Sequence, residues 1–178
     1  MQNLRASTSV TSDLAKALGA LADELATAYG DDATGRPVID VAVEGTSREL
    51  HPIVRADVYR IAAEALRNAH RHADARQIEV RIRYDVAQLG VRVQDDGKGI
   101  DAVIREHERP GHFGLPGMRE RAQVIGGSLD VWSEVSLGTA VDLTIPAAAA
   151  YATSRRQRAG RGLFGRFAGW HRIFGRFE

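Results

Sequence analysis

Three short stretches, each rich in polar residues or in glycine, lie in the middle of the chain, and each lies within or beside a segment with a regular hydrophobic pattern. One lies inside an expected helix, one follows an expected strand, and one precedes an expected helix. In order they are Glu64-x-x-x-Asn68-x-x-Arg71-His72, Asp95-Asp96-Gly97-Lys98-Gly99 and Gly114-Leu115-Pro116-Gly117-Met118. This arrangement predicts a fold in which a helix face, a strand end and a loop meet around one ligand.

The first stretch lies in residues 53–73, which contain no proline or glycine and predict a helix. One arc of this helix is apolar and the neighbouring arc is polar. The apolar arc holds Val58, Ile61, Ala62, Ala65 and Ala69, and the polar arc holds Glu64, Asn68, Arg71 and His72. Glu64 and Asn68 lie one turn apart and can reach one site, where Mg²⁺ needs few protein ligands because it keeps several waters. The alternative is a solvated polar stripe.

The second stretch ends residues 88–94, in which apolar and polar residues alternate as in a half-buried strand. Asp95 then lies at the carboxyl end of the strand, beside a turn that glycine favours. A carboxylate there can accept a hydrogen bond from an exocyclic amine, which separates adenine from guanine at that edge. The alternative is an Asp-Gly hairpin turn, although residues 100–108 show no strand pattern that would complete a hairpin.

The third stretch belongs to residues 109–117, whose glycine and proline content predicts an irregular, movable loop. Residues 118–125 then predict a short helix that ends at Gly126-Gly127. A helix amino terminus preceded by glycines is suited to anions. Arg119 and Arg121 would add positive charge that a triphosphate can use.

Five segments have strand patterns, at residues 38–43, 77–84, 88–94, 128–134 and 139–145. Together with the helices they predict an α/β (α+β) two-layer sandwich, with a mixed, mainly antiparallel sheet and helices on one face. Thr139 begins the last strand, where its hydroxyl would be free to donate to a phosphate. The alternative for Thr139 is an ordinary β-branched strand residue.

Taken together, these residues resemble the ATP-binding catalytic domain of sensor histidine kinases, in the gyrase, Hsp90, histidine kinase and mismatch-repair (GHKL) superfamily. Residues 57–73 are similar to its N box, residues 95–100 to its G1 box, and residues 112–122 to the G2 box of the nitrate-sensor and desaturase-sensor branch. The likeness covers about residues 13–146. It implies a Bergerat-type ATP-binding fold with ATP and Mg²⁺ as cofactors.

The resemblance implies roles for the residues nearest the metal and the base. Asn68 would ligate the Mg²⁺ that bridges the phosphates, and Glu64 would help position the metal or its water, so these two are the expected catalytic residues. Arg71 and His72 would approach the phosphate tail. Asp95 would hold the adenine amine.

The resemblance also implies that backbone segments line the nucleotide. Gly97 and Gly99 would let the chain pass close to the base, beside Ile100, and Thr139 would contact the base or an ordered water near it. The end of a lid over the phosphates would consist of Gly114, Leu115, Gly117 and Met118. His112 stands where the usual Gly-x-Gly-Leu pattern has its first glycine, which narrows the backbone freedom of this lid.

The implied activity is transfer of the ATP γ-phosphate to a histidine on a dimerisation segment. None of the six histidines precedes an acidic residue within a long amino-terminal helix, so we expect the phosphoacceptor to lie outside this chain. The implied partners are that segment, a response regulator, and a second copy in a full-length homodimer. Two alternatives stay open: a serine kinase similar to the anti-sigma-factor kinases, and an ATP-dependent interaction module without transfer.

Three regions are expected along the chain. Residues 1–30, with leucines at helical spacing, would be the end of a dimerisation or linker helix, residues 31–147 the ATP-binding domain, and residues 148–178 a tail that begins with an Ala-rich linker. Residues 154–178 hold seven arginines and one glutamate, whereas the remaining chain has a net charge of −5. Aromatic residues interleave with these arginines. Such a tail could contact an anionic membrane, dock on its own acidic domain or stay disordered, and nucleic acid is the less favoured partner.

Composition excludes several other classes of protein. The chain has no cysteine, which excludes disulfide and thiol chemistry. No run of 18 apolar residues predicts a membrane span, and we expect a cytoplasmic domain. No Gly-x-x-x-x-Gly-Lys-Ser/Thr motif occurs, which excludes a P-loop kinase.

Overall fold

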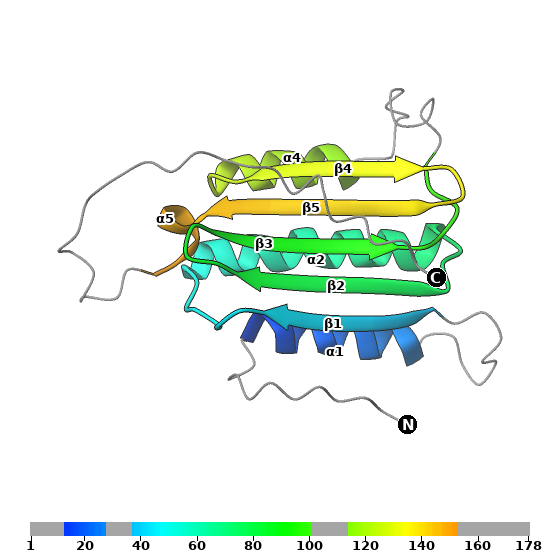
Figure 1. Ribbon diagram of the computed structural model, residues 1–178, viewed down its shortest axis with the longest axis horizontal. Coiled ribbons are helices and arrows are strands. Elements are labelled where there is room, and N and C mark those ends of the chain that lie inside the picture. Colours follow the sequence, from blue (N-terminus) through cyan, green and yellow to red (C-terminus); the bar gives the residue numbers. More distant parts are fainter. Residues whose placement is uncertain (1–12, 28–36, 101–113, 153–178) are drawn as a thin grey trace.

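A computed structural model describes residues 13–27, 37–100 and 114–152 of the chain (Figure 1). These residues form a five-stranded sheet with helices on one of its faces. The elements are α1 (Asp13–Thr27), β1 (Val38–Glu44), α2 (Pro52–His72), β2 (Gln77–Tyr84), β3 (Gln88–Asp95), α4 (Gly114–Val124), β4 (Ser128–Glu134), β5 (Gly138–Pro146) and α5 (Ala147–Ala150).

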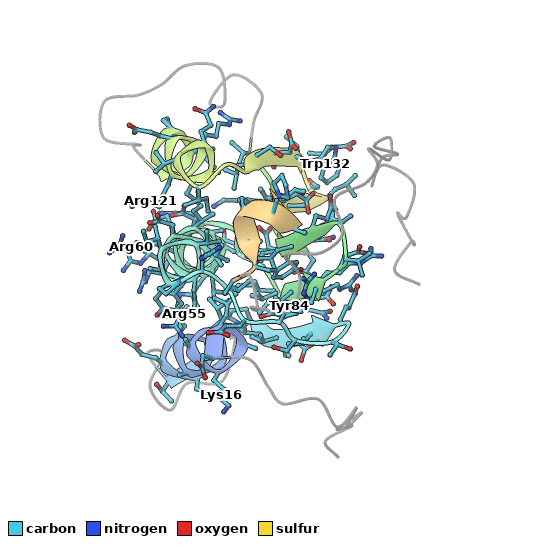
Figure 2. All side chains as sticks on the ribbon, turned by 90° about the vertical axis from the view of Figure 1, so that its left-hand side faces the viewer. Lys16, Arg55, Arg60, Tyr84, Arg121 and Trp132 are labelled. Carbon is cyan, nitrogen blue, oxygen red and sulfur yellow. The ribbon has the colours of Figure 1, made fainter. Side chains whose placement is uncertain are left out.

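The strands lie in the order β1-β2-β3-β5-β4. β1 pairs with β2 in parallel, which the crossover through α2 allows, and the other three pairs are antiparallel. In Figure 2 the helices α1, α2 and α4 form a layer on one side of the sheet. The predicted two-layer sandwich with a mainly antiparallel sheet is therefore confirmed, as are all five predicted strands.

The core lies between the sheet and the helix layer. Alternate residues of β2 point toward the helices, and Ile78, Val80 and Ile82 are all fully buried. The predicted apolar arc of α2 packs on them, and Leu66, outside the predicted arc, is also fully buried. Each such aliphatic side chain contributes about 1.5–3 kcal/mol relative to an exposed one, so this interface fixes the position of α2 on the sheet.

Helix α1 belongs to the same core. Leu14, Leu18 and Leu21 are each less than 5% exposed, and α1 lies against β1 and α2. The Nε2 atom of His70 on α2 also lies 3.1 Å from the carbonyl oxygen of Leu25. The leucine spacing predicted this helix correctly, while the division of the chain at residue 30 stays a prediction.

Helix α4 differs from the prediction at its start. It begins at Gly114, so residues 114–117, predicted as loop, form its first turn. Pro116 is compatible with a first turn, because the backbone N–H groups there have no intrahelical partner. The predicted end is correct: Gly126 has a positive φ of 74° and Gly127 N donates to Ala122 O at 2.8 Å. Residues 101–113 lie outside the described residues, including His112 and the first part of the predicted lid.

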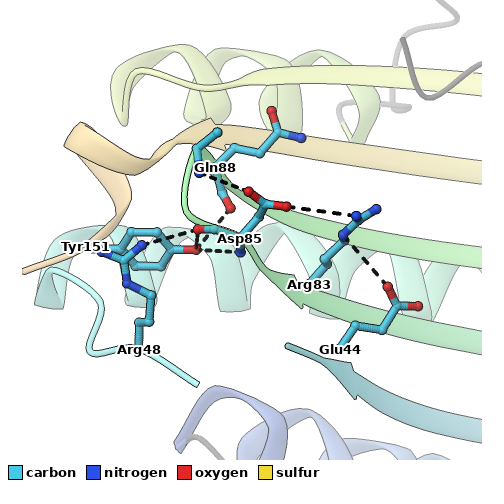
Figure 3. A network of polar contacts seen from close by, with 7 residues as sticks. Glu44, Arg48, Arg83, Asp85, Gln88 and Tyr151 are labelled. Atoms are coloured by element: carbon cyan, nitrogen blue, oxygen red, sulfur yellow. Dashed lines mark hydrogen bonds and ion pairs between the residues drawn. The ribbon is translucent and has the colours of Figure 1, made fainter. Parts of the chain in front are cut away.

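The segment after β5 also has a different secondary structure from the predicted one. Residues 147–150, expected as a linker, form the short helix α5, and Tyr151 packs behind it (Figure 3). The Tyr151 hydroxyl accepts a hydrogen bond from Asp85 N at 3.2 Å and lies 3.0 Å from the carbonyl oxygens of Asp85 and Gln88. The Arg48 guanidinium lies 3.6 Å above the Tyr151 ring. We call this group of residues the tyrosine clamp, and burial within it raises the pKa of the Tyr151 phenol.

None of the helices in the described ranges is long and apolar enough to cross a membrane.

Candidate functional site

Helix α2 and the start of α4 bring the first and third stretches together. Glu64 and Asn68 are half-buried on adjacent turns of α2. A Cβ atom at Gly114 would lie 3.2 Å from Glu64 Oε1 and 3.3 Å from Asn68 Nδ2. Glycine at position 114 therefore keeps the space in front of the carboxylate and the amide open.

Neither Glu64 nor Asn68 forms a hydrogen bond or ion pair within the described part of the chain. Most polar side chains withdrawn from water find a partner in the protein. Two neighbouring half-buried groups without one are suited to a ligand that supplies phosphate oxygens or a hydrated cation. Their placement supports the predicted roles, which stay predictions.

The second stretch places a buried carboxylate at the end of β3. Asp95 is 5% exposed, and its Oδ1 accepts hydrogen bonds from Gly97 N at 3.0 Å and Thr139 N at 3.2 Å. Oδ2 accepts no hydrogen bond from any described residue. Burial raises the pKa of Asp95, although the two amide hydrogen bonds act in the opposite direction. One oxygen of Asp95 is thus fixed by the backbone, and the other is available to a ligand donor.

The loop after Asp95 is fixed on the carboxyl end of α2. Lys98 N donates to Ala73 O at 2.8 Å, and a Cβ at Gly97 would lie 2.2 Å from the same Ala73 oxygen. Gly99 has a φ of +69°, and a Cβ there would lie 2.1 Å from Glu134 O. Both glycines are therefore required by contacts within the protein itself. That these two glycines also lie close to the adenine base stays a prediction.

Asp96 and Lys98 of the same loop have structural contacts that the sequence did not indicate. Asp96 Oδ1 accepts hydrogen bonds from Arg76 N and Gln77 N, both at 2.8 Å, and so ties the loop to the start of β2. Lys98 Nζ lies 2.8 Å from Asp74 Oδ2 and lowers the pKa of that exposed carboxyl. Solvent screens this second pair, so it adds little to stability.

Ser133 is a residue of this region that the sequence analysis missed. Its Oγ accepts a hydrogen bond from Ile100 N at 2.7 Å, donates to Gly138 O at 3.1 Å, and lies 2.9 Å from Thr139 Oγ1. The Thr139 hydroxyl, expected to be free, therefore contacts Ser133. The pairing of Ser133 with Thr139 across a short hairpin was the signal available, because it places both on the helix side of the sheet.

The remaining predicted residues lie in different surroundings. Arg71 and His72 are exposed at the carboxyl end of α2. They directly precede Ala73, whose carbonyl oxygen accepts a hydrogen bond from Lys98 N in the loop after β3. Leu115 and Gly117 are half-buried on the first turn of α4, whereas Met118 is 3% exposed and belongs to the hydrophobic core. A contact between Met118 and a ligand stays a prediction.

Arg121 has a partner on α2. Its Nη1 lies 3.5 Å from Oδ1 of the buried Asp57, which also accepts a hydrogen bond from Arg60 Nη1 at 3.2 Å. The charge that was expected to face a triphosphate instead links α4 to α2. Because Arg121 lies in the last turn of α4, this link ties the carboxyl end of α4 to α2.

The described residues contain no group of three or more His, Asp or Glu side chains that could hold a metal ion. A cation at this site would need most of its oxygen ligands from a bound molecule and from water. The amide oxygen of Asn68 with the Glu64 carboxylate is a donor set that suits Mg²⁺ brought by phosphates.

Comparison with protein-family models shows which family the central part of the chain resembles. The family described as histidine kinase-, DNA gyrase B- and HSP90-like ATPase (HATPase_c) matches residues 53–149, more than half of the chain. The matched region includes α2, the loop after β3, α4 and both strands of the β4–β5 hairpin.

Curated relatives are similar over part of their length. An uncharacterised sensor-like histidine kinase of Chloroflexus aurantiacus is 36% identical over 112 residues, which cover 60% of this chain and 19% of the relative. The signal transduction histidine-protein kinase/phosphatase DegS of Bacillus subtilis is 29% identical over 103 residues, which cover 58% of this chain and 27% of DegS. The match thus spans about a quarter or less of these relatives.

A solved structure supports the same likeness. The histidine kinase domain of a blue-light activated histidine kinase from Erythrobacter litoralis superposes with a TM-score of 0.57 at 28% identity. The superposition covers 76% of this chain and 61% of that chain.

Proposed function

Since the chain belongs to the histidine kinase-, DNA gyrase B- and HSP90-like ATPases, we propose that it is the ATP-binding catalytic domain of a sensor histidine kinase. In this proposal it binds ATP between α2, the loop after β3 and the start of α4, and directs the γ-phosphate to a histidine on a dimerisation segment outside the described residues. Its relatives are named as histidine kinases, which supports a histidine acceptor over the serine-kinase alternative.

The observation that carries the proposal is that one carboxylate oxygen of Asp95 accepts hydrogen bonds from the protein and the other does not. Two backbone amides hold its Oδ1, while Oδ2 has no partner among the described residues. Asp95 is 5% exposed, and a carboxylate largely withdrawn from water is stabilised by each further hydrogen bond that it accepts. The exocyclic amine of adenine would supply the missing donor, which makes Asp95 the residue that selects the base.

Phosphates would lie nearer the middle of α2. Asn68 and Glu64 are one turn apart there, face Gly114, and have no partners among described residues, and we assign Mg²⁺ to these two side chains. When bound, Mg²⁺ would neutralise charge that develops on the phosphates during transfer. The exposed Arg71 and His72 would add positive charge toward the phosphate tail.

The wider setting of the domain is also part of the proposal. Its partners would be the phosphoacceptor segment, a response regulator, and a second copy in the full-length dimer. The domain would work in the cytoplasm, with or without a membrane anchor elsewhere in the full-length protein. Contact between the basic tail and a membrane stays a prediction that the experiment in the next subsection tests.

Nucleotide binding tests the site. We would measure the affinity for a non-hydrolysable ATP analogue, with and without Mg²⁺, in the wild-type chain and in Asp95→Asn and Asn68→Asp variants. Loss of a hydrogen bond to a charged group predicts about 10–100-fold weaker binding for Asp95→Asn. Asn68→Asp places a negative charge beside the phosphates and should weaken binding mainly in the presence of Mg²⁺.

Asp96→Asn is the matched control, because it makes the same chemical change one residue away. Its Oδ1 can still accept from Arg76 N and Gln77 N, so affinity should not change. Unchanged affinity in both Asp95→Asn and Asn68→Asp would refute the site assignment. Equal losses in Asp95→Asn and Asp96→Asn would show that the loop matters only as structure.

Phosphate transfer tests the reaction separately from binding. The chain would be incubated with labelled ATP and a dimerisation segment from a related histidine kinase, and the labelled residue identified by its stability to acid and base. Acid-labile label on a histidine supports the proposal. Label on a serine would support the serine kinase, and binding without transfer to any segment tried would favour the interaction module.

A further inference from the structure

No described helix covers the second face of the sheet, which we call the outward face (Figure 2). On the edge strand β4, the exposed side chains are those of alternate residues, and these point to the outward face. Three of them, Asp130, Trp132 and Glu134, form the outward stripe of β4. Trp132 is 37% exposed, so part of its indole is accessible to solvent on this face.

The two faces of the domain carry opposite net charge. The outward face has more carboxylates than guanidinium groups, namely Asp40, Glu44, Glu79, Asp130, Glu134 and Asp142 against Arg81, Arg83 and Arg92. Helices α2 and α4 have the reverse, namely Arg55, Arg60, Arg67, Arg71, Arg119 and Arg121 against Asp57, Glu64 and Glu120. Helix α1 adds Asp13, Asp23 and Glu24 against Lys16, so the whole helix layer has a net charge of +1, compared with −3 for the outward face. A strongly basic segment is therefore attracted to the outward face, and the nearly neutral helix layer offers no comparable attraction.

Ion pairs within the outward face show which of its carboxylates are available to a basic segment. Its three arginines already lie within 4.0 Å of outward carboxylates, Arg81 and Arg83 beside Glu44, and Arg92 beside Asp142. Asp130 and Glu134 form no ion pair with any described residue. The carboxylates that remain available to a basic partner thus flank Trp132 on β4.

The chain itself holds a segment with the complementary composition. Residues 153–178 carry seven arginines, one glutamate, and aromatic residues at short intervals. The aromatic residues are Phe164, Phe167, Trp170, Phe174 and Phe177. Guanidinium groups pair with carboxylates and stack on indole rings. A segment rich in arginine and aromatic residues is therefore complementary to the outward stripe, in which Asp130 and Glu134 flank Trp132.

The start of this segment lies within reach of the stripe. Ala152 N donates to Glu49 O at 3.0 Å, and the tyrosine clamp holds the preceding residue at the turn between β2 and β3. The sheet edge at β4 is three strand spacings from β2, about 14 Å. Residues 153–163, which precede Phe164, can span up to about 36 Å when extended. They can therefore cross the sheet and place the aromatic part along β4.

We propose that residues 153–178 dock on the outward face of their own domain, along the outward stripe of β4. The arginines pair with Asp130 and Glu134, and an aromatic ring or guanidinium group covers the Trp132 indole. Docking places a basic cover on the face opposite the helix layer, so it leaves Glu64, Asn68 and Gly114 accessible. The inference does not depend on the proposed kinase activity.

Short-range quenching of Trp132 fluorescence tests the docking in the full chain. Trp170→Phe leaves Trp132 as the single tryptophan, and Ala168→Cys introduces the single cysteine, which carries a nitroxide quencher. Docking predicts about a twofold loss of Trp132 emission relative to the unlabelled chain at low salt, and recovery at about 0.5 M NaCl, where ion pairs are screened. The thermal midpoint of each variant would confirm that it is folded.

Charge reversal identifies the surface. Asp130→Lys combined with Glu134→Lys should remove the quenching, because both positions are exposed and lose their attraction for arginine. Asp40→Lys is the matched control on the other edge strand of the same face, and it should retain the quenching. Quenching that survives the β4 substitutions, or that Asp40→Lys removes equally, would overturn the proposal.

Other partners for the tail give different results. Quenching between a labelled chain lacking Trp132 and an unlabelled chain would indicate docking on a second copy and overturn the intramolecular proposal. Absence of quenching in solution, together with binding to phosphatidylserine vesicles or to nucleic acid, would overturn it in favour of that partner. Quenching that is independent of protein concentration supports it.

Discussion

The two ends of the sheet differ in how completely their polar groups are paired. At the end formed by the tyrosine clamp, the Tyr151 hydroxyl has three backbone neighbours and its ring is covered by Arg48. At the opposite end, Asp95 Oδ2 lacks a partner among the described residues, as do the half-buried Glu64 and Asn68 along α2. The first end is suited to holding the fold together, and the second retains the unsatisfied groups that a ligand needs.

This difference separates stability from binding. Substitutions in the tyrosine clamp should change the free energy of unfolding and leave nucleotide affinity alone. Substitutions near Asp95 should change affinity, and they should also change stability wherever the backbone approaches closely.

The largest effect is expected for Gly138→Ala, at the Asp95 end. Gly138 has a φ of +91°, and a Cβ there would lie 2.0 Å from Asp95 O. We expect the variant to lose about 3 kcal/mol or more of unfolding free energy in urea titration, because strain and a backbone clash combine. Gly19→Ala, with nothing within 4 Å of its Cβ on α1, should instead be neutral or slightly stabilising. Equal effects at the two glycines would contradict this geometry.

The next largest effect is expected for Tyr151→Phe, at the clamp. The change removes the hydroxyl donor that faces Asp85 O and Gln88 O, while Asp85 N keeps its hydrogen bond to Gln88 O at 3.0 Å. Loss of the hydroxyl contacts in this part-buried setting predicts a loss of about 1–2 kcal/mol in the same titration. Tyr84→Phe is the control, since the Tyr84 hydroxyl is buried without a hydrogen-bond partner among described residues and its removal should cost nothing. Affinity for the ATP analogue should be unchanged in both. Weaker binding in Tyr151→Phe would show that the two ends are coupled.

A smaller effect is expected for Ser133→Ala. Ile100 N loses its acceptor and Thr139 loses its hydroxyl neighbour, so stability should fall by about 1 kcal/mol. Unlike Tyr151→Phe, this variant should also bind the ATP analogue several-fold more weakly, because Ser133 supports Thr139 beside Asp95. Isothermal titration calorimetry of both variants at the same temperature would measure the two affinities for the ATP analogue. An unchanged affinity would place Ser133 with the purely structural residues.

The smallest effect concerns pH. Burial raises the pKa of Asp95 in the folded chain, so the ionised carboxylate favours unfolding. Its contribution to stability is fully present below the unfolded pKa of about 3.9 and is lost as pH rises through the folded value. Relative to Asp95→Asn, the wild type should therefore become less stable as pH rises from 4 to 7 in urea titrations. A constant difference between the two proteins across this range would show that the folded pKa is ordinary.

Local patterns in the sequence were sufficient for most of the fold. The alternation along residues 77–84 and the apolar arc of α2 each predict which side chains are buried. Gly126 marks the end of α4, because glycine readily adopts the positive φ found there. The start of α4 was missed because Pro116 was taken as a loop signal. The clamp was missed because Tyr151 meets Asp85 across 66 positions, a separation that no local pattern reports.

The candidate site divides in the same way. Glu64, Asn68 and Asp95 were predicted because their residue types and spacing match a known set of motifs, and the structure brings Glu64 and Asn68 together at Gly114. Ser133 and the partner of Arg121 depend on strand register and on helix packing. Those are properties of the assembled chain, so the supporting contacts around a motif are harder to predict than the motif.

The position of β5 also has a consequence for the order of events during synthesis. This strand, the last among the described residues, lies inside the sheet between β3 and β4 and is hydrogen-bonded on both sides. Until the ribosome has released residue 146, β3 has an open edge and β4 has no neighbour in the sheet. Nascent chains that stop short of β5 would therefore expose β3 to pairing with other chains, and chaperone binding before that point would protect them from aggregation.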